Sequence, residues 1–429
     1  MKLNFTLLFL FFSVMTYAQT RHCGVVSTRQ NGQPGSPAFE NFIQQKLLER
    51  RQNRQSETEA TYRIPVIVHI VHNGEPVGEG TNISAAQVYS QIEVLNEDFS
   101  RTNPDASNTR SAFDNVVAGI DIEFVPATIG PDGFPLEEPG IDRVQGTQAQ
   151  WTNQQTLTSL RPQTIWDPDL YFNIWTLDYV DPFLGFAQFP IAPSGLEGLE
   201  GETDPASTAG VAVDYDNFGA ISKVITPQLQ EGEPYNEGRT LTHEVGHFFG
   251  LIHIWGDGGC SEDDFCEDTP SSDSPNFRCE DVDEPFKCGN LDMFENYMDY
   301  TRDVCMNAFT QDQVDRMIIV LENAPRRRSL LNSPTANPIN EGLFANFEAD
   351  RTTVCAGQGV AFSDISQAFN TTPVQLWNWT FEGGDPETSD SQAPFVEYLN
   401  PGTYDVSLYV EDILENSQRS REDYITVVD

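Results

Sequence analysis

Three of the six histidines in the chain fall within one window of eleven residues, and their spacing suits a metal ion. The window begins at His243, continues through His247 and ends at His253. Residues four apart lie on one face of a helix, so His243 and His247 can point at a single ion. Imidazole nitrogen is a good zinc ligand, and a catalytic zinc site keeps one position open for water. The spacing therefore predicts a zinc site with three histidine ligands.

Two other residues of the window support a catalytic zinc site, one through its chemistry and one through its backbone conformation. Glu244 follows the first histidine and can take a proton from a water that the metal activates, then deliver it to a leaving amine. Gly250 can adopt the left-handed conformation that ends a helix, so the chain can turn and bring His253 to the same ion. An ordinary buried helix with incidental histidines is the alternative, and it does not account for so complete a set of groups. We interpret the window as a catalytic centre.

The elements that must position this window predict an α/β first half. The β-branched run Ile64–Val71 indicates a buried strand, with the folded domain starting near residue 60. Ser84 is a good N-cap for an amphipathic helix that runs through Leu95. A helix from Glu237 to Phe249 is expected to carry the histidines. Further expected elements are helices over 38–51 and 311–323, and strands over 120–126, 170–177 and 210–215.

The extended histidine window resembles the zinc motif of the metzincin peptidases. The segment Asn296–Tyr300 is similar to the methionine-containing turn that lies beneath the metal in that clan, which would make Met298 the apolar floor of the site. The segments that narrow the resemblance to the pappalysins are Ile64–Val68, Leu184–Pro190, Gly210–Tyr215 and Ile254–Asp257. The resemblance covers about residues 58–332. It implies an α/β (α+β) metzincin catalytic domain with two subdomains flanking an active-site cleft, one catalytic zinc ion and endopeptidase activity.

The same resemblance implies roles for two residues near the methionine turn. Tyr300 would sit near the zinc and steady the transition state; a merely packed tyrosine is the alternative. Asp303 would line the pocket just beyond the scissile bond and pair with Arg or Lys of a substrate, because pappalysins tend to cleave before basic residues. Its alternative is a surface aspartate in an acidic chain.

The seven cysteines are an odd number, so in an exported protein at least one is unpaired or shared between molecules. Five of them lie between positions 260 and 305, which suggests disulfides that staple a loop-rich region. The family pattern implies that Cys260 pairs with Cys288 and that Cys279 pairs with Cys305. Cys266 and Cys355 lie outside that pattern, and their state stays open.

Cys23 stands in a polar segment, 19–57, that we interpret as a latency pro-segment. A thiolate is a strong zinc ligand and can fill the open position of the metal, and latent metzincins use a cysteine in this way. The alternative is a disulfide from Cys23 to Cys355 or Cys266. Release would need cleavage near Arg50, Arg51 or Arg54, and residues 326–328 offer a similar basic site before the C-terminal region.

The acidic stretch 264–270 resembles a calcium-binding segment of pappalysins. The oxygen donors would be the Asp264 carboxylate, the Glu267 carbonyl and Thr269. A plain acidic loop is the alternative. If the ion is present, we expect it to be structural.

The C-terminal region changes to short alternating strands with turn residues, which is typical of a small all-β sandwich. The segments Trp377–Gly384 and Pro401–Leu408 resemble the immunoglobulin-like PKD domain. We expect a linker over 334–343 and this domain over 344–429, after a catalytic domain over 58–333. The tryptophans are expected in its core. Its role is a spacer or an anchor for substrate.

Residues 1–18 are typical of a signal peptide, with a basic start, an apolar run and a small residue at the end. No other stretch is long and apolar enough to span a membrane. The formal net charge of −41 disfavours nucleic acid and anionic membranes as partners. We therefore expect a secreted, extracellular enzyme whose partners are protein or peptide substrates.

Two other classes of function remain to be weighed against a peptidase. The first is an inert secreted adhesion or binding protein with a metzincin-like domain, but such relatives typically lose the glutamate or a histidine. Glu244 and all three histidines are present here. The second is a zinc hydrolase of non-peptide substrates, which the methionine turn does not favour. The sequence leaves the natural substrate and the oligomeric state open.

Overall fold

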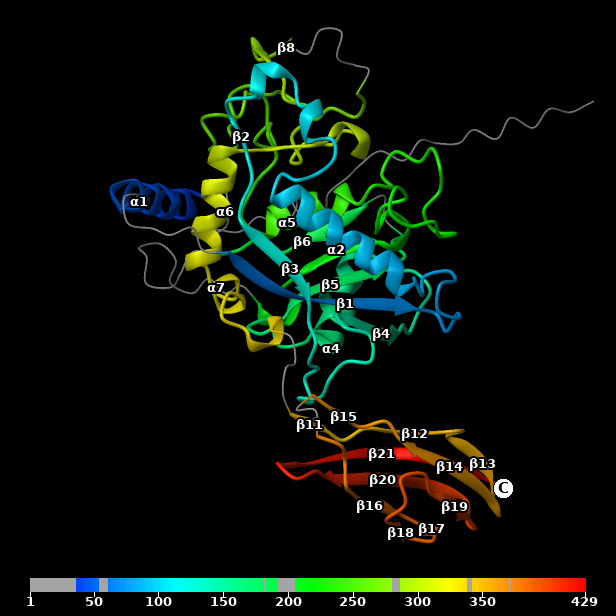
Figure 1. Cartoon of the computed structure of the whole chain (residues 1–429). Coiled ribbons are helices and arrows are strands. Elements are labelled where there is room, and N and C mark those ends of the chain that lie inside the picture. Colours follow the sequence, from blue (N-terminus) through cyan, green and yellow to red (C-terminus); the bar gives the residue numbers. More distant parts are fainter. Residues whose placement is uncertain are drawn as a thin grey trace, which may run out of the picture. The chain divides into compact units, whose positions relative to one another are not determined.

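The structure is a computed structural model that describes residues 36–53, 61–180, 183–191, 205–279, 286–337, 342–369 and 372–429 (Figure 1). The chain divides into two compact units. The first runs to Pro126 and continues from Gly140 to Pro334, and the second comprises Ala127–Pro139 and Thr335–Asp429. The predicted signal peptide and Cys23 lie outside the described residues.

The centre of the first unit is a six-stranded, mostly parallel sheet. Its order is β3-β1-β5-β7-β6, and β4 also pairs with β1. The strands are β1 (Tyr62–His72), β3 (Ile122–Pro126), β4 (Ile141–Gln145), β5 (Phe172–Leu177), β6 (Gly185–Ala187) and β7 (Val211–Asp214). Strand β1 is buried for most of its length, as a β-branched run within a parallel sheet should be. Strand β6, which the sequence did not signal, runs antiparallel to β7 at one end of the sheet.

Two helices pack on this sheet and on each other, α2 (Ala85–Phe99) and α5 (Arg239–Phe248). As predicted, Ser84 caps α2, and its hydroxyl accepts a hydrogen bond from the backbone N–H of Gln87 at 3.2 Å. The apolar residues Leu241 and Val245 of α5 are fully buried in the main core. Helix α5 therefore has one face in the core, while its histidines lie on another.

Other short elements complete the first unit. They are α1 (Pro37–Asn53), η2 (Ala106–Asn108), η3 (Ser111–Phe113), β2 (Val117–Ala118), α3 (Asn153–Gln155), η4 (Thr156–Leu160), α4 (Arg161–Thr164), η5 (Ala206–Thr208), η6 (Tyr215–Asn217), β8 (Phe286–Lys287), β9 (Asn290–Leu291), η8 (Asp303–Cys305), β10 (Phe309–Thr310), α6 (Gln311–Asn323) and α7 (Arg327–Leu330). Thr310 caps α6 through a reciprocal pair of hydrogen bonds with Gln313.

The described residues between α5 and β10 form little regular structure, in agreement with the loop-rich region predicted around the clustered cysteines. Two disulfides join parts of this region, one between Cys260 and Cys288 and one between Cys279 and Cys305. Cys266 is buried and Cys355 is exposed, and neither forms a disulfide with another described residue. This segment has few helical or sheet hydrogen bonds to constrain it. The two disulfides therefore contribute much of its constraint.

The second unit is a sandwich of two main sheets, β12-β14-β19-β17 and β13-β21-β20-β16-β18. Their strands pair antiparallel except for β13, which runs parallel to β21. Its strands are β11 (Leu343–Phe344), β12 (Phe347–Ala349), β13 (Thr353–Cys355), β14 (Gln358–Asp364), β15 (Gln367–Ala368), β16 (Leu376–Phe381), β17 (Gly384–Asp385), β18 (Thr388–Ser389), β19 (Phe395–Tyr398), β20 (Gly402–Glu411) and β21 (Asn416–Val428), preceded by η9 (Pro334–Ala336). Trp379 is fully buried in its core. Trp377 is only partly buried, and its indole N–H donates to Asp364 at 2.8 Å.

The second unit also includes a segment from the middle of the chain, Ala127–Pro139, inserted between β3 and β4. Arg419 of the sandwich forms an ion pair with Asp132 at 3.2 Å and lies over the ring of Phe134 at 4.8 Å. The Phe134 ring in turn packs edge-on against Phe344. No local pattern in the sequence signals this insertion, since it depends on contacts across more than 200 residues.

Candidate active site and metal centre

The three histidines meet in one buried place. Nε2 of His247 lies 3.1 Å from Nε2 of His243 and 3.1 Å from Nε2 of His253, and all three side chains are almost completely buried. Among the described residues, this is the cluster whose ligand atoms lie close enough together to hold a metal ion. The structure thus brings together all three residues that the spacing predicted.

The turn at Gly250 makes this convergence possible. Gly250 has a φ of 93°, and a Cβ there would lie 2.8 Å from Cγ2 of Val320, so both its conformation and its surroundings require glycine. Its N–H donates to the carbonyl of His247, and the N–H of Leu251 donates to that of Gly246, each at 2.9 Å. This pair of bonds is the Schellman motif, which ends a helix and reverses the chain. The chain then returns His253 to the face of α5 that carries the other two histidines.

The other nitrogen of each ring has its own hydrogen-bond acceptor. Nδ1 of His243 lies 2.7 Å from the carbonyl oxygen of Tyr297, and Nδ1 of His247 lies 2.8 Å from that of Leu251. Nδ1 of His253 is hydrogen-bonded to Oδ1 of Asp257. Each Nδ1 therefore carries the ring proton, which leaves the three Nε2 lone pairs facing one another. Such an arrangement is repulsive without a cation and fits a zinc ion.

Glu244 projects from α5 against strand β6. A Cβ on Gly185 would lie 2.7 Å from Cγ of Glu244. Any residue larger than glycine at this position would therefore clash with the glutamate. Glu244 itself is buried. The predicted general base thus lies on the helix that carries His243 and His247 and packs against the strand at the end of the sheet.

The methionine turn packs under the histidines. A Cβ on Gly246 would lie 2.5 Å from the sulfur of the fully buried Met298. The ring of Tyr300 lies 5.6 Å from that of His243 and 4.9 Å from that of His253, measured between centroids. The structure places both residues in the immediate surroundings of the metal centre.

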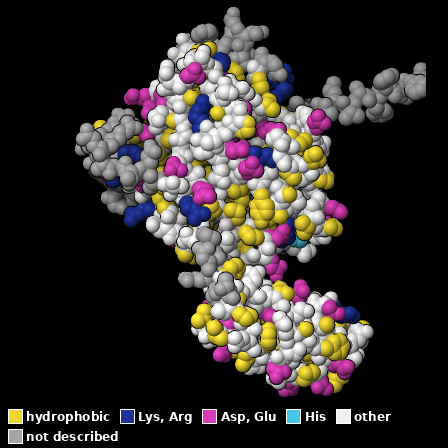
Figure 2. Space-filling model, in the orientation of Figure 1, with side chains coloured by type: hydrophobic (Ala, Val, Ile, Leu, Met, Phe, Trp, Pro, Cys, Tyr) yellow, Lys and Arg dark blue, Asp and Glu magenta, His cyan; other side chains and the backbone are white. Residues whose placement is uncertain are grey.

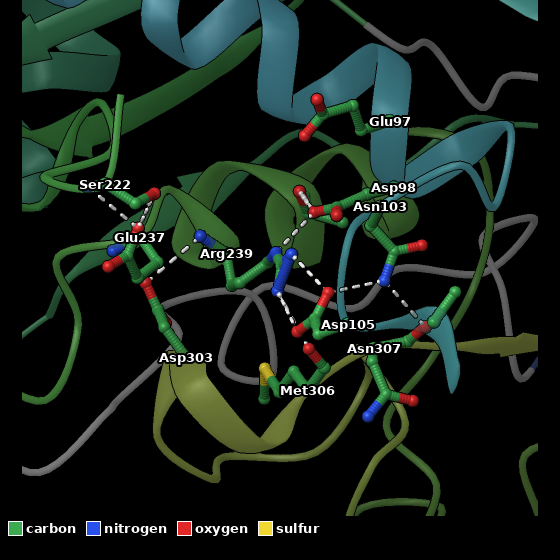
Figure 3. Close-up of polar contacts among 12 residues, drawn as sticks. Glu97, Asp98, Asn103, Asp105, Ser222, Glu237, Arg239, Asp303, Met306 and Asn307 are labelled. Atoms are coloured by element: carbon green, nitrogen blue, oxygen red, sulfur yellow. Dashed lines mark hydrogen bonds and ion pairs between the residues drawn. The ribbon is translucent and has the colours of Figure 1, made fainter. Parts of the chain in front are cut away.

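Asp303 is fully buried, so the alternative of a surface aspartate is wrong. Its Oδ2 accepts hydrogen bonds from the backbone N–H groups of Glu237 and Arg239, at 2.9 and 3.1 Å (Figure 3). The N-cap residue of α5 is Gly238, which has no side chain to accept such bonds. Asp303 therefore supplies from a distant part of the chain the acceptor that the helix N-terminus needs.

A buried polar network, which sequence reasoning missed, connects α2, α5 and the methionine turn. Figure 3 shows the part of it around Asp98, Asp105 and Arg239. Asp98 on α2 lies 2.8 Å from Nε of Arg239 and accepts hydrogen bonds from the hydroxyl groups of Thr242 and Tyr297. Arg239 also pairs with Asp105 through both terminal nitrogens. Burial raises the pKa of Asp98 to about 7, while the charge of Arg239 and the two hydroxyl groups act to lower it. Nothing in the local sequence around a single charged residue predicts which distant residue it will pair with in the fold.

The calcium candidates lie between α5 and β10, in the irregular segment. Asp264 is buried, and its Oδ1 accepts from the N–H of Cys266, while its Oδ2 has no hydrogen-bond partner among the described residues. Thr269 is also buried, and Glu267, whose predicted donor is the backbone carbonyl, is exposed. An unpartnered buried carboxylate oxygen calls for a cation or water.

The comparisons with known proteins agree with this site. Residues 227–322 match the peptidase family described as pregnancy-associated plasma protein-A, and residues 344–427 match the PKD domain. The solved structure of mature mirolysin from Tannerella forsythia, in complex with a cleaved peptide, is 38% identical, with a TM-score of 0.56; the match covers 66% of this chain and 100% of that one. The chain belongs to the pappalysin family of metzincins. It is accordingly a metalloprotease, and its histidine cluster fits the zinc ion that this family implies.

Other relatives are similar. The structure of promirolysin is 35% identical, with a TM-score of 0.55, over 70% of this chain and 96% of that one. An extracellular metalloprotease of Arthroderma benhamiae is 26% identical over 256 residues, which are 59% of this chain and 75% of the relative. Extracellular metalloprotease 1 of Coccidioides posadasii is 47% identical over 146 residues, 34% of this chain and 47% of that protein. The predicted metzincin fold and the PKD-like sandwich are thus confirmed.

Proposed function

We propose that this pappalysin is a secreted zinc endopeptidase that cleaves proteins before Arg or Lys and is made as a latent precursor. The observation that carries the proposal is the convergence of three buried Nε2 atoms beside a glutamate at the end of the sheet. The solved relatives include one described as in complex with a cleaved peptide. The alternative of an inert binding protein has no support from the site, since no catalytic group is missing.

The residues of the site divide the work of hydrolysis. His243, His247 and His253 would hold the zinc ion, which when bound supplies a Lewis acid that activates water and polarises a carbonyl. Glu244 takes the proton of the attacking water and passes it to the leaving amine. The phenol of Tyr300 donates a hydrogen bond to the oxygen on which negative charge develops. Strand β6, whose outer edge pairs with no described strand, offers backbone groups to an extended substrate.

The central prediction concerns Glu244. In the protein freed of its pro-segment, Glu244→Ala should lower kcat by at least about a hundredfold, because the proton transfer loses its base. A zinc chelator should abolish cleavage as well. We would map the cuts in a mixed peptide library by mass spectrometry for both proteins, with and without chelator. Cleavage that persists in Glu244→Ala would contradict the mechanism. A folded, zinc-loaded wild-type protein that cleaves no peptide would favour the hypothesis of an inert binding protein.

The preference for basic residues is proposed to rest on Asp303. Since Asp303 also caps α5, replacing it with Ala would disturb the helix that carries His243 and His247. Asp303→Asn is the sharper test, because the amide oxygen can still accept from the two backbone N–H groups while the charge is removed.

We expect Asp303→Asn to keep its fold and to lose about tenfold or more in kcat/KM for substrates with Arg after the scissile bond. Substrates with Leu at the same position should be affected much less. The ratio of the two kcat/KM values measures the preference. An unchanged ratio in a folded Asp303→Asn protein would reduce Asp303 to a capping residue.

Latency is proposed to rest on Cys23, with helix α1 as an anchor of the pro-segment. On α1, Phe39, Phe42 and Ile43 are buried in a cluster with residues of α6. Glu40 pairs through both carboxylate oxygens with the buried Arg316, at 2.6 Å each. Nε of Arg316 donates to the carbonyl of Gly250, where α5 ends. The anchor thus contacts the same turn that positions His253.

We expect Cys23→Ala to make the uncleaved precursor active, because the thiolate no longer fills the open position of the metal. The assay is the initial rate on a fluorogenic peptide, taken while the precursor still runs at full length on a gel. Cys355→Ala removes an exposed cysteine that pairs with no described residue, and it serves as the matched control; it should leave the precursor latent. A Cys23→Ala precursor that stays inactive, or a disulfide at Cys23 in the wild type, would rule out this form of latency.

The calcium site is proposed to form around Asp264, whose Oδ2 has no hydrogen-bond partner among the described residues, with oxygens of Glu267 and Thr269. Calcium should raise the Tm of the chelator-treated protein, because a ligand that binds only the folded state stabilises it. Asp264→Asn should lose most of that rise, whereas the exposed neighbour in Asp263→Asn should keep it. Equal calcium responses in the wild type and in Asp264→Asn would point to a plain acidic loop.

Export and the C-terminal domain complete the proposal. The relatives in fungi are named extracellular, and among the described residues no helix is long and apolar enough to cross a membrane. Figure 2 shows Asp and Glu side chains spread over the displayed face. The PKD domain is proposed to act as a spacer or substrate anchor. Cleavage at Arg327 is not proposed, because this residue is buried and its guanidinium donates to the carbonyls of Phe248 and Gln188.

A further inference from the structure

The third histidine differs from the other two in what its Nδ1 contacts. His243 and His247 meet neutral backbone carbonyls, whereas His253 meets the carboxylate of Asp257, four residues further along. The Asp257 side chain is 8% exposed, so water screens this contact little. A carboxylate holds the imidazole proton more strongly than a carbonyl does. The three rings are therefore not electronically equivalent.

The backbone at Asp257 is strained in a way that glycine would avoid. Asp257 has a φ of 61°, in the left-handed region that side chains rarely adopt. Its neighbours Gly256 and Gly258 are glycines, and Gly256 has a φ of 62°. A side chain kept at such a position, between glycines, indicates that the side chain itself is needed. Aspartate is one of the few residues that this conformation tolerates.

The surroundings of His253 leave the ring little freedom. The Trp255 ring stacks on it with centroids 4.3 Å apart and planes 3° apart, and Tyr300 approaches edge-on at 4.9 Å. Trp255 and Tyr300 fix the plane of the imidazole, but neither determines which nitrogen carries the proton. The contact with Asp257 does, because a carboxylate accepts and cannot donate.

We propose that Asp257 is a positioning residue for the metal centre: its carboxylate holds the Nδ1 proton of His253 and makes Nε2 a stronger donor to zinc. The inference rests on the proposed function, since it assumes that His253 is a zinc ligand. Loss of such a partner of a metal-binding histidine typically weakens metal binding by about ten- to a hundredfold. The carboxylate contacts Nδ1 of His253, and through that ring its effect would reach the reaction.

Two substitutions separate the carboxylate from the backbone. Asp257→Asn keeps the size, the tolerance of a positive φ and an acceptor oxygen, but removes the charge. Asp257→Gly removes the side chain and relieves the strained backbone. Asp263→Asn neutralises an exposed carboxylate of the same segment that belongs to no proposed catalytic group, and it is the control.

We would measure zinc affinity by competition with a chromophoric chelator, the Tm of the zinc-free proteins, and kcat and KM of the zinc-loaded ones. We expect zinc affinity to fall about tenfold in Asp257→Asn and further, toward a hundredfold, in Asp257→Gly. The zinc-free Tm of Asp257→Asn should stay close to that of the wild type, because its amide oxygen can still accept from Nδ1 of His253. The control should match the wild type throughout.

The outcomes separate this inference from the proposed function. Wild-type zinc affinity in both Asp257 variants would overturn the inference, and so would a fall in affinity accompanied by a lower zinc-free Tm in Asp257→Asn, which marks a structural role. A wild type that binds zinc but cuts no peptide would defeat the proposed function and leave the zinc measurements decisive for Asp257. A wild type that binds no zinc would overturn both.

Discussion

Three imidazoles whose lone pairs face one another in a buried place are the constraint on which the rest of the structure depends. Without a cation this arrangement is repulsive, so the fold must hold each ring against the others. It does so through the outer nitrogens, which are bound to the carbonyls of Tyr297 and Leu251 and to the carboxylate of Asp257. Each of these acceptors lies in a turn, and each turn has to be held in its own place.

Holding those turns explains much of the buried polar structure. Tyr297 is tied through its hydroxyl to Asp98 on α2, and Asp98 is tied to Arg239 and Thr242 at the start of α5. At the other end of α5, Arg316 and Arg327 donate to the carbonyls of Gly250 and Phe248. Buried charges of this kind are costly unless they are paired and hydrogen-bonded. Here they connect the two ends of the metal-binding helix to α2, α6 and the methionine turn.

The Asp303 carboxylate has one structural role, which is to cap α5, and one proposed functional role, which is to select basic substrates. The N-terminus of α5 has free N–H groups and a glycine at the capping position, so it needs an acceptor from elsewhere. Asp303 provides it from the segment that follows the methionine turn. The structural requirement brings a negative charge close to the catalytic helix, where the proposed selection of basic substrates would use it. The two roles differ in what they require of the side chain: capping α5 needs only an acceptor oxygen, whereas the proposed selection of basic substrates needs the negative charge.

What the sequence by itself determined was local. The four-residue spacing of His243 and His247, the cap at Ser84 and the glycine at 250 each act within one or two turns of chain, and strand, helix and zinc motif could be predicted from them. The disulfide pairs came from the resemblance to a family, and the structure contains both. Only the tertiary structure decided the partners of Asp98, Asp257, Asp303 and Arg316, the short strand β6, and the insertion of 127–139 into the second unit. A charged side chain finds its partner through the whole path of the chain, and no local pattern records that path.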